Sequence, residues 1–262
     1  MWQDAKLLNA TANALFGMVA LALLAVGLWW VIQRPMFVLK SIEVEGEAQQ
    51  ALRHVNAATI RGTALPRIKG NFFTVNLDAV RSAFEAVPWV RKASVRREWP
   101  DRLAVTLEEY MPLGTWGEEG RLLSVKGDVF TANLDEAEED AELIEFSGPD
   151  GSEKDVVERY AELKKWFAPV NLEPEAVHLS ARYAWTVKLN NGMTVELGRE
   201  QDSSAVMQER VARLVAAYPQ LVAQLQDKIE SVDLRYPNGM ALKADGLALG
   251  TVKGNRKASG TT

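Results

Sequence analysis

The longest apolar stretch of the chain runs from Ala14 to Ile32 and contains no charged or strongly polar residue. As a helix it would rise about 28 Å, which is close to the hydrocarbon thickness of a bilayer. Within lipid the backbone must satisfy its own hydrogen bonds, so an isolated segment of this kind must be helical. Trp29 and Trp30 lie near its end, where their rings suit the membrane interface. The pattern therefore predicts one transmembrane helix over residues 14–32.

A cleaved signal peptide and a buried core helix are the two alternatives for this stretch. A signal peptide has a shorter apolar core, a basic start and small residues at its exit, whereas this stretch ends in bulky residues. A core helix rarely runs this far without a polar face. The charges do not orient the helix, because Lys6 and the terminal amine on one side face Arg34 and Lys40 on the other. Residues 1–13 form a tail too short to fold by itself.

Residues 37–110 show the pattern of a small globular unit. The elements expected are a strand near 38–46, an amphipathic stretch at 51–60, a short extended segment at 71–75, a helix at 77–86 and a hairpin at 93–107. Asn76 is a natural N-cap for the second helix. This order predicts an α+β sandwich in which helices pack on one face of a three-stranded sheet.

Residues 111–250 form a second unit in which turn signals separate short apolar runs, a pattern typical of β-structure. Ser152 to Asp155 fit a capping box for an amphipathic helix, and a second such helix includes Met207 to Tyr218, stopped or kinked at Pro219. A final hairpin follows at 231–243. We predict a mixed α+β domain with a mainly antiparallel sheet, and then a disordered tail at 251–262.

One hairpin allows its register to be predicted. Apolar residues alternate on both sides of Asn190 to Gly192, and a two-residue loop would put the two apolar faces out of phase. A three-residue loop instead pairs Leu189 with Met193 and Trp185 with Leu197. We therefore predict the longer loop, with Gly192 in the left-handed conformation.

Composition and charge exclude several functional classes. The chain has 30 Lys and Arg against 35 Asp and Glu, so no global positive field favours nucleic acid. The absence of cysteine removes disulfides and thiolate chemistry, and the two histidines, His54 and His178, are too few for a His-rich metal centre. The acidic stretch from Asp135 to Glu145 is expected to be a solvated loop, because it lacks the spacing of a calcium loop.

No catalytic motif stands out in the sequence. A nucleophile elbow, a Walker-type phosphate loop, the His-Glu-x-x-His motif and a dinucleotide fingerprint are all absent. We therefore predict no catalytic residues, no cofactor, no metal site and no enzymatic activity.

Basic residues crowd the hairpin of the first unit, namely Arg91, Lys92, Arg96, Arg97 and Arg102. They could meet anionic lipid or an acidic partner. They could also be the charges of a solvated sheet face, which discourage pairing of sheet edges. The second interpretation is favoured.

The run from Pro88 to Leu103, followed by Val105, Leu107, Glu109, Pro112 and Trp116, resembles the membrane-proximal POTRA domain of the bacterial cell-division protein FtsQ/DivIB family. Further similarity lies at Trp185 to Arg199 and at Arg235 to Gly239. Together the similar segments cover about residues 14–250 in the order of the family.

The resemblance implies a bitopic protein of the cell inner membrane, with its N-terminus in the cytoplasm and a POTRA domain and a β domain in the periplasm. It also implies a non-enzymatic role at the division septum. There the family binds FtsB and FtsL and helps regulate septal peptidoglycan synthesis, with further division proteins meeting the POTRA domain and the membrane segment.

The site residues follow from the same resemblance, in which the segment from residue 235 to 239 and the strand after it contact FtsB. Tyr236 is carried over as an aromatic anchor, Asn238 and Gly239 as turn and backbone contacts, and Arg199 as a candidate for an acidic partner residue. The remaining candidates on this segment and strand are Arg235, Met240 and Leu242. An incoming peptide would add to the edge strand by β-augmentation. Ordinary hairpin chemistry, with Tyr236 at the rim of the core, is the alternative.

Two features depart from the family. Its members often carry an aromatic residue just after the final strand, where this chain has Lys243 and Ala244, and the N-terminal tail is very short. The alternative functions are a membrane-anchored POTRA-type accessory for protein assembly or transport, and an anchored periplasmic hydrolase of the cell wall.

Overall fold

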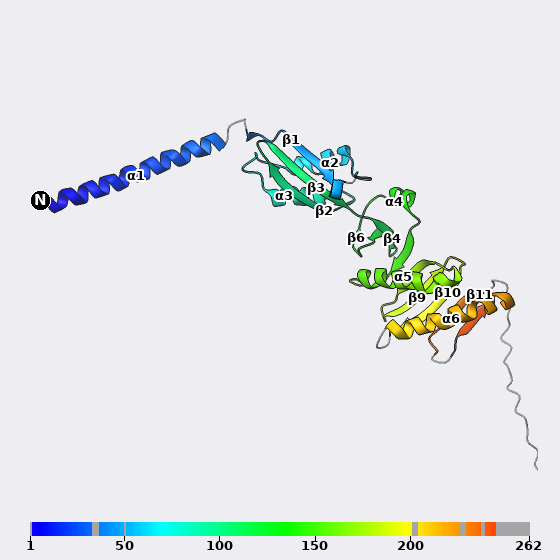
Figure 1. Ribbon diagram of the computed structural model, residues 1–262. Helices are drawn as coiled ribbons and strands as arrows, with labels where there is room; N and C mark the ends of the chain where they lie inside the picture. The colour runs from blue at the N-terminus through cyan, green and yellow to red at the C-terminus, as the bar shows by residue number, and fades with distance from the viewer. Residues whose placement is uncertain are drawn as a thin grey trace, which may run out of the picture. The chain divides into compact units, whose positions relative to one another are not determined.

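The computed structural model describes residues 2–32, 37–49, 51–200, 204–225, 229–236 and 239–244. The chain divides into two compact units, residues 1–110 and 111–262 (Figure 1). The predicted tail at 251–262 lies outside the described residues.

Helix α1, Trp2–Ile32, contains the predicted span. Its segment Asn9–Trp30 is the one part of the described chain that is long and apolar enough to cross a membrane, and none of it is buried against other parts of the protein. This finding favours a membrane span over a buried core helix. The helix begins well before Ala14, so most of the short tail before the apolar stretch is helical as well.

The rest of the first unit is a three-stranded sheet with helices. Its elements are β1 Ser41–Gly46, η2 Glu47–Gln49, α2 Ala57–Thr63, η3 Leu65–Arg67, α3 Leu77–Glu85, β2 Val90–Glu98 and β3 Arg102–Glu109. The strand order is β1-β3-β2, with β1 parallel and β2 antiparallel to β3. Asn76 caps α3 as predicted, because its side chain accepts hydrogen bonds from the N–H groups of Asp78 and Ala79.

The second unit is built on a nine-stranded sheet of order β12-β11-β10-β9-β8-β7-β4-β5-β6. Its elements are β4 Pro112–Trp116, β5 Arg121–Ser124, β6 Val129–Phe130, α4 Leu134–Asp140, β7 Ile144–Ser147, α5 Glu153–Phe167, η4 Ala168–Val170, β8 Pro174–Leu179, β9 Ala184–Leu189, β10 Thr194–Arg199, α6 Ser204–Leu225, β11 Ile229–Asp233 and β12 Ala241–Ala244. Only β4–β7, β7–β8 and β10–β11 pair in parallel, so the predicted mainly antiparallel sheet is confirmed.

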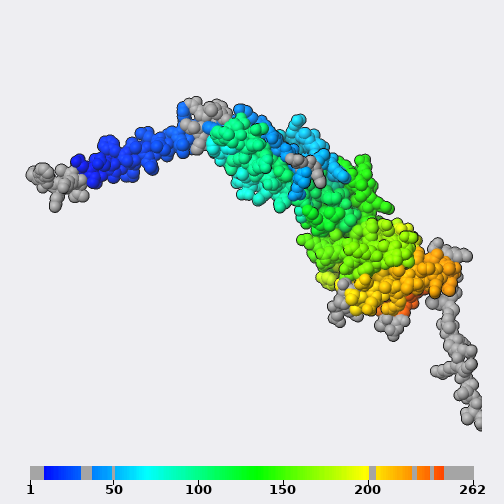
Figure 2. Space-filling model, viewed as in Figure 1, coloured from blue at the N-terminus to red at the C-terminus, as the bar shows by residue number. Residues whose placement is uncertain are grey.

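Helices α5 and α6 pack on the same face of this sheet. Each connects two parallel neighbouring strands, β7 to β8 and β10 to β11, and both connections step in the same direction along the strand order. Strands β7, β8 and β10 also run in the same direction. Crossover connections between parallel strands are right-handed, so both helices lie on the same face of the sheet. The outer side of α6 forms part of the surface in Figure 2.

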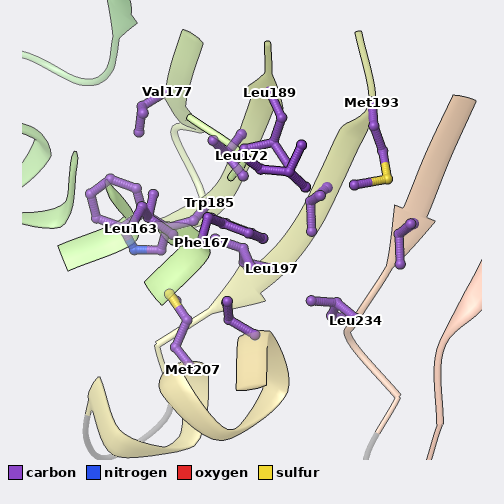
Figure 3. Packing of buried hydrophobic residues seen from close by; sticks show 14 of the residues in the cluster. Leu163, Phe167, Leu172, Val177, Trp185, Leu189, Met193, Leu197, Met207 and Leu234 are labelled. Atoms are coloured by element: carbon purple, nitrogen blue, oxygen red, sulfur yellow. The ribbon is translucent and has the colours of Figure 1, made fainter. Parts of the chain in front are cut away.

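The core of the second unit lies between these helices and the sheet. In Figure 3, Leu163 and Phe167 of α5 and Met207 of α6 gather with residues of β9 and β10. Trp185, Val187 and Leu189 on β9 are buried, whereas Thr186 and Lys188 between them are not. The period of two thus separates a covered face from a solvated one.

The predicted three-residue loop after Leu189 is confirmed. The N–H of Leu189 donates to the carbonyl of Met193 at 2.9 Å, and Gly192 has a φ of +80°. The expected pair of Trp185 with Leu197 is wrong, because a β-bulge between Glu196 and Gly198 places Trp185 opposite Gly198. Gly198 takes a φ of +79°, a conformation that side chains disfavour.

Three other local expectations need correction, the first at residues 71–75. This segment is a turn rather than extended chain, because the Asn71 side chain accepts hydrogen bonds from the N–H groups of Phe73 and Thr74.

The second correction is at the acidic stretch after Asn133. This stretch begins as helix α4 rather than a loop, since acidic residues favour the first turn of a helix.

The third correction concerns the predicted capping box at Ser152. Its backbone is not extended, and its hydroxyl donates to the carbonyl of Pro149 at 2.6 Å instead of capping α5. The capping box of the described chain is formed by Asn56 and Thr59 at the start of α2. Helix α6 continues through Pro219 to Leu225.

Gly114 is essential to the pairing of β4 with β7, because a Cβ at this position would lie 1.9 Å from the carbonyl oxygen of Ile144. We expect Gly114→Ala to lower the free energy of unfolding of the second unit by about 3 kcal/mol. Gly117→Ala is the control, since a Cβ there meets nothing within 4 Å and only its positive φ costs about 1–2 kcal/mol. Thermal unfolding measures both, and equal losses would contradict the steric explanation.

Candidate functional site

Strand β12 forms one edge of the nine-stranded sheet. It pairs antiparallel with β11, with Leu242 opposite Val232 and Ala241 opposite Asp233. No other described strand lies on its outer side. The backbone groups on that side of an edge strand are open to a further strand.

The side chains near this edge alternate between core and solvent. Met240 and Leu242 are partly buried and pack against the core cluster, whereas Ala241 and Lys243 are exposed. The Nζ of Lys243 lies 2.6 Å from a carboxylate oxygen of Glu230 on β11. The edge therefore has a partly apolar face and a charged face.

Arg235 lies just after β11 and is held by two carboxylates. Its guanidinium donates to both oxygens of Asp233, at 2.9 and 2.7 Å, and lies 2.9 Å from Glu196 on β10. The hydrogen bonds from the Arg235 side chain lower the pKa of the Asp233 carboxyl, and the same contact raises the pKa of Arg235. This charged group fixes the backbone where the chain leaves β11.

Tyr236 and Gly239 flank the turn between β11 and β12, and the Tyr236 side chain is 55% exposed. Arg213 of α6 donates to both of their carbonyl oxygens, at 3.4 Å for Tyr236 and 3.3 Å for Gly239. Asn238 lies outside the described residues. Helix α6 thus supports the turn while the tyrosine ring remains accessible.

Arg199 occupies a different position from the other candidates. It is exposed at the end of β10, opposite Ala184, and β10 is the third strand from the edge. The structure therefore brings Arg235, Tyr236, Gly239, Met240 and Leu242 together at one edge and leaves Arg199 on an inner strand.

The sequence interpretation missed Asp233, Glu196 and Arg213 as parts of this site. The pair Asp233 and Arg235 could have been found, because residues two apart in extended chain lie on one face. Arg213 is distant in sequence from the turn that it contacts, so no local pattern identifies it.

The basic hairpin of the first unit is largely satisfied within the unit. Arg91 pairs with Glu108 and Arg102 with Glu43, while Arg97 donates to two backbone carbonyls. These contacts agree with the favoured interpretation of a structural and solvated face.

Ser147 and His178 form a hydroxyl–imidazole pair of the kind used in nucleophilic catalysis. Ser147 and His178 lie opposite each other on β7 and β8, with the hydroxyl 2.6 Å from Nδ1, and no carboxylate among the described residues forms a hydrogen bond with this histidine. A nucleophile and base of the triad type require such an orienting group. Within the part of the chain that the structure describes, no three His, Cys, Asp or Glu residues are placed to hold a metal.

A hollow of about 610 Å³ lies beside α5, and four of its eight lining residues are acidic. The buried Arg159 in this lining is bound by Glu162 and Glu200, each at 2.7 Å, and lies beside the ring of Trp185 at 5.3 Å. These contacts make Arg159 a structural ion-pair centre.

These features define a class of protein: an apolar N-terminal helix followed by two folded units, the second of which has β12 as an edge strand of its described sheet. Residues 37–110 match the model of the POTRA domain, FtsQ-type, and residues 114–235 match that of cell division protein FtsQ/DivIB, C-terminal.

Relatives over nearly the whole chain agree with these matches. Cell division protein FtsQ of Burkholderia pseudomallei is 54% identical over 247 residues, covering 94% of this chain and 96% of the relative. That of Bordetella pertussis is 42% identical over 253 residues, covering 92% of each, and that of Neisseria gonorrhoeae is 29% identical over 249 residues, covering 94% and 97%. The chain belongs to the FtsQ/DivIB family of cell division proteins.

The expected family and fold class are confirmed by these matches, and the apolar helix together with the relatives indicates a single-pass membrane protein. The C-terminal family match ends at residue 235, so Tyr236 and the edge strand lie just beyond it.

The pairing of Asp233 with Arg235 predicts a specific titration. Because the pKa of Asp233 is lowered in the folded protein, the pair contributes to stability above about pH 4 and loses this contribution as the pH falls through the lowered pKa. We expect Arg235→Gln to return the pKa of Asp233 toward its ordinary value, as measured by carboxyl-carbon NMR. Lys243→Gln is the control and leaves it lowered. An Asp233 titration that Arg235→Gln leaves unchanged would contradict this assignment.

Proposed function

We propose that this protein is a non-enzymatic scaffold of the bacterial divisome, anchored in the inner membrane at the septum. Its N-terminus is cytoplasmic and its two folded units are periplasmic. It binds FtsB and FtsL through the edge strand β12 and thereby helps to regulate septal peptidoglycan synthesis. The observation that carries this proposal is the open side of β12 next to the exposed ring of Tyr236.

Binding by strand addition explains how one short edge can select a partner. An extended peptide beside β12 exchanges backbone hydrogen bonds with it, and every second side chain of the peptide lies on the same face. One face of the extended sheet offers the partly buried Met240 and Leu242, and the other offers the exposed Lys243. A partner strand with alternating apolar and polar residues fits this surface.

The proposed roles of the individual residues follow from their positions. Tyr236 is the aromatic anchor, because exposed aromatic side chains contribute strongly at interfaces. Asn238 and Gly239 provide turn and backbone contacts. Arg235 orients the turn, since two carboxylates already bind its guanidinium, and Arg199 is a candidate for a more distant acidic residue of the partner.

The POTRA domain and the membrane segment also have binding roles in this proposal. Other division proteins contact the POTRA domain and the membrane segment. The alternative role, a POTRA-type accessory in protein assembly or transport, is less well supported because the second unit also matches the division family. Depletion separates the two roles: filamentous, undivided cells support the scaffold, and defects of outer-membrane assembly support the accessory.

We expect Tyr236→Ala to weaken binding of an FtsB peptide by about tenfold or more, because loss of an aromatic anchor costs about 1–2 kcal/mol or more. Fluorescence anisotropy with the full-length protein in nanodiscs measures the affinity. Tyr183→Ala is the matched control, since this tyrosine is similarly exposed and lies outside the edge. An unchanged affinity for Tyr236→Ala, with the fold intact by circular dichroism, would exclude the anchor role.

Backbone pairing is tested separately by altering the peptide. Only every second N–H of an added strand points toward β12. We therefore expect N-methylation at one set of alternate FtsB positions to abolish binding and at the other set to leave most of it. Equal tolerance of both sets would show that the peptide binds without adding a strand.

A further inference from the structure

An exposed aromatic cluster occupies the end of the first unit where β1 begins and β2 turns into β3. We define it as Phe37, Phe73 and Trp99. The buried ring of Phe72 packs against two of them, with centroids 5.2 Å from Phe73 and 5.7 Å from Trp99. The ring centroids of Phe37 lie 4.9 Å from Phe73 and 6.1 Å from Trp99. Trp99 is 64% exposed and Phe73 is 44% exposed. Such large aromatic rings are costly to leave together in water.

The backbone around this aromatic cluster is firmly held. The N–H of Phe72 donates to the carbonyl of Phe37, and Arg97 of β2 donates to the carbonyls of Phe72 and Val75, each at 2.8 Å. On the other side, Lys40 forms an ion pair with Asp101 at 2.6 Å. The aromatic rings therefore project from a rigid support rather than from a loose loop.

The covalent chain limits how far this cluster can lie from the membrane. Helix α1 ends at Ile32, so only four residues precede Phe37. Even fully extended, the steps from Ile32 to Phe37 span at most about 17 Å. The cluster is thus tethered within reach of the headgroup layer that borders a membrane-spanning α1.

The chemistry of the cluster suits that layer. Tryptophan and other amphipathic rings concentrate at the membrane interface, where the apolar face meets acyl chains and the polar edge meets water. Val38 adds exposed apolar surface at 52%, and the exposed Lys40 can lie near lipid phosphates. The same surface on a unit far from a membrane would instead suggest a protein partner.

We propose that the aromatic cluster of Phe37, Phe73 and Trp99 is a lipid-contact site that seats the POTRA domain on the phospholipid surface around α1. The contact restricts the tilt of this domain relative to the bilayer. Its occupant is the bilayer itself, and the contact needs no partner protein.

The absence of cysteine in the chain allows a direct test with single spin labels. Val38→Cys reports next to the cluster, and Ala86→Cys is the control. Ala86 is exposed at the end of α3, four residues before β2 begins, whereas Trp99 directly follows the end of β2, and β2 itself spans about 26 Å from Val90 to Glu98. The purified full-length protein is placed in nanodiscs of phosphatidylethanolamine and phosphatidylglycerol, and power-saturation electron paramagnetic resonance compares access of oxygen and of a water-soluble nickel complex.

We expect the label at residue 38 to show at least a threefold higher ratio of oxygen to nickel access than the label at residue 86. Phe73→Ser together with Trp99→Ser should lower the ratio at residue 38 to that of the control. Trp99→Phe, which keeps an aromatic ring, should retain most of the difference. Thermal unfolding checks the fold, and the single variant Trp99→Ser serves if the double variant does not fold.

Two results would overturn the proposal. One is a ratio at residue 38 that equals the control while the aromatic cluster is unsubstituted, which would show that the cluster does not contact lipid. The other is a high ratio that Trp99→Ser and the double variant leave unchanged, which would show that the tether alone brings residue 38 to the membrane.

Discussion

The architecture of the second unit depends on the burial of two crossover helices against one face of its sheet. The buried residues of α5 and α6 meet those of β9 and β10 in one continuous core. Because both crossovers lie on this face, the opposite face of the sheet is left to residues such as Thr186 and Lys188. A sheet covered on one side can be extended at its edge without creating an uncovered apolar face, provided that the added strand also alternates.

The same packing explains why the final strand is at an edge. Helix α6 returns the chain beside β10, so that β11 pairs with it in parallel, and the short turn after Tyr236 then places β12 on the outer side of β11. Arg213 joins α6 to this turn through the carbonyls of Tyr236 and Gly239. The helix that completes the core thereby also positions the candidate binding surface, which couples stability of the domain to the geometry of its edge.

Patterns of period two and 3.6 were sufficient to predict the hairpin of β2 and β3 and the three-residue loop at Gly192. They failed where a single residue changed the local geometry. The bulge at Gly198 shifts the partner of Trp185, and no alternation of apolar residues encodes an extra residue in one strand. Ser152 failed as a cap because its backbone is not extended, a property that the sequence motif does not contain. The candidate edge was predictable from the family resemblance, but Arg213 was not, since its contact depends on tertiary packing.

The lipid-contact site exposes apolar side chains, whereas the sheet edge exposes backbone N–H and C=O groups. At the edge, charged side chains of Lys243 and Glu230 limit unwanted pairing, as is common for natural sheet edges. The aromatic cluster is also flanked by charges, those of Lys40 and Asp101, but its exposed area is dominated by Trp99 and Phe73. Exposed apolar patches of neighbouring side chains commonly mark sites that contact a protein or a membrane. Because the cluster follows the membrane segment by so few residues, the bilayer is the cover that is always present, whereas any partner protein would have to be recruited.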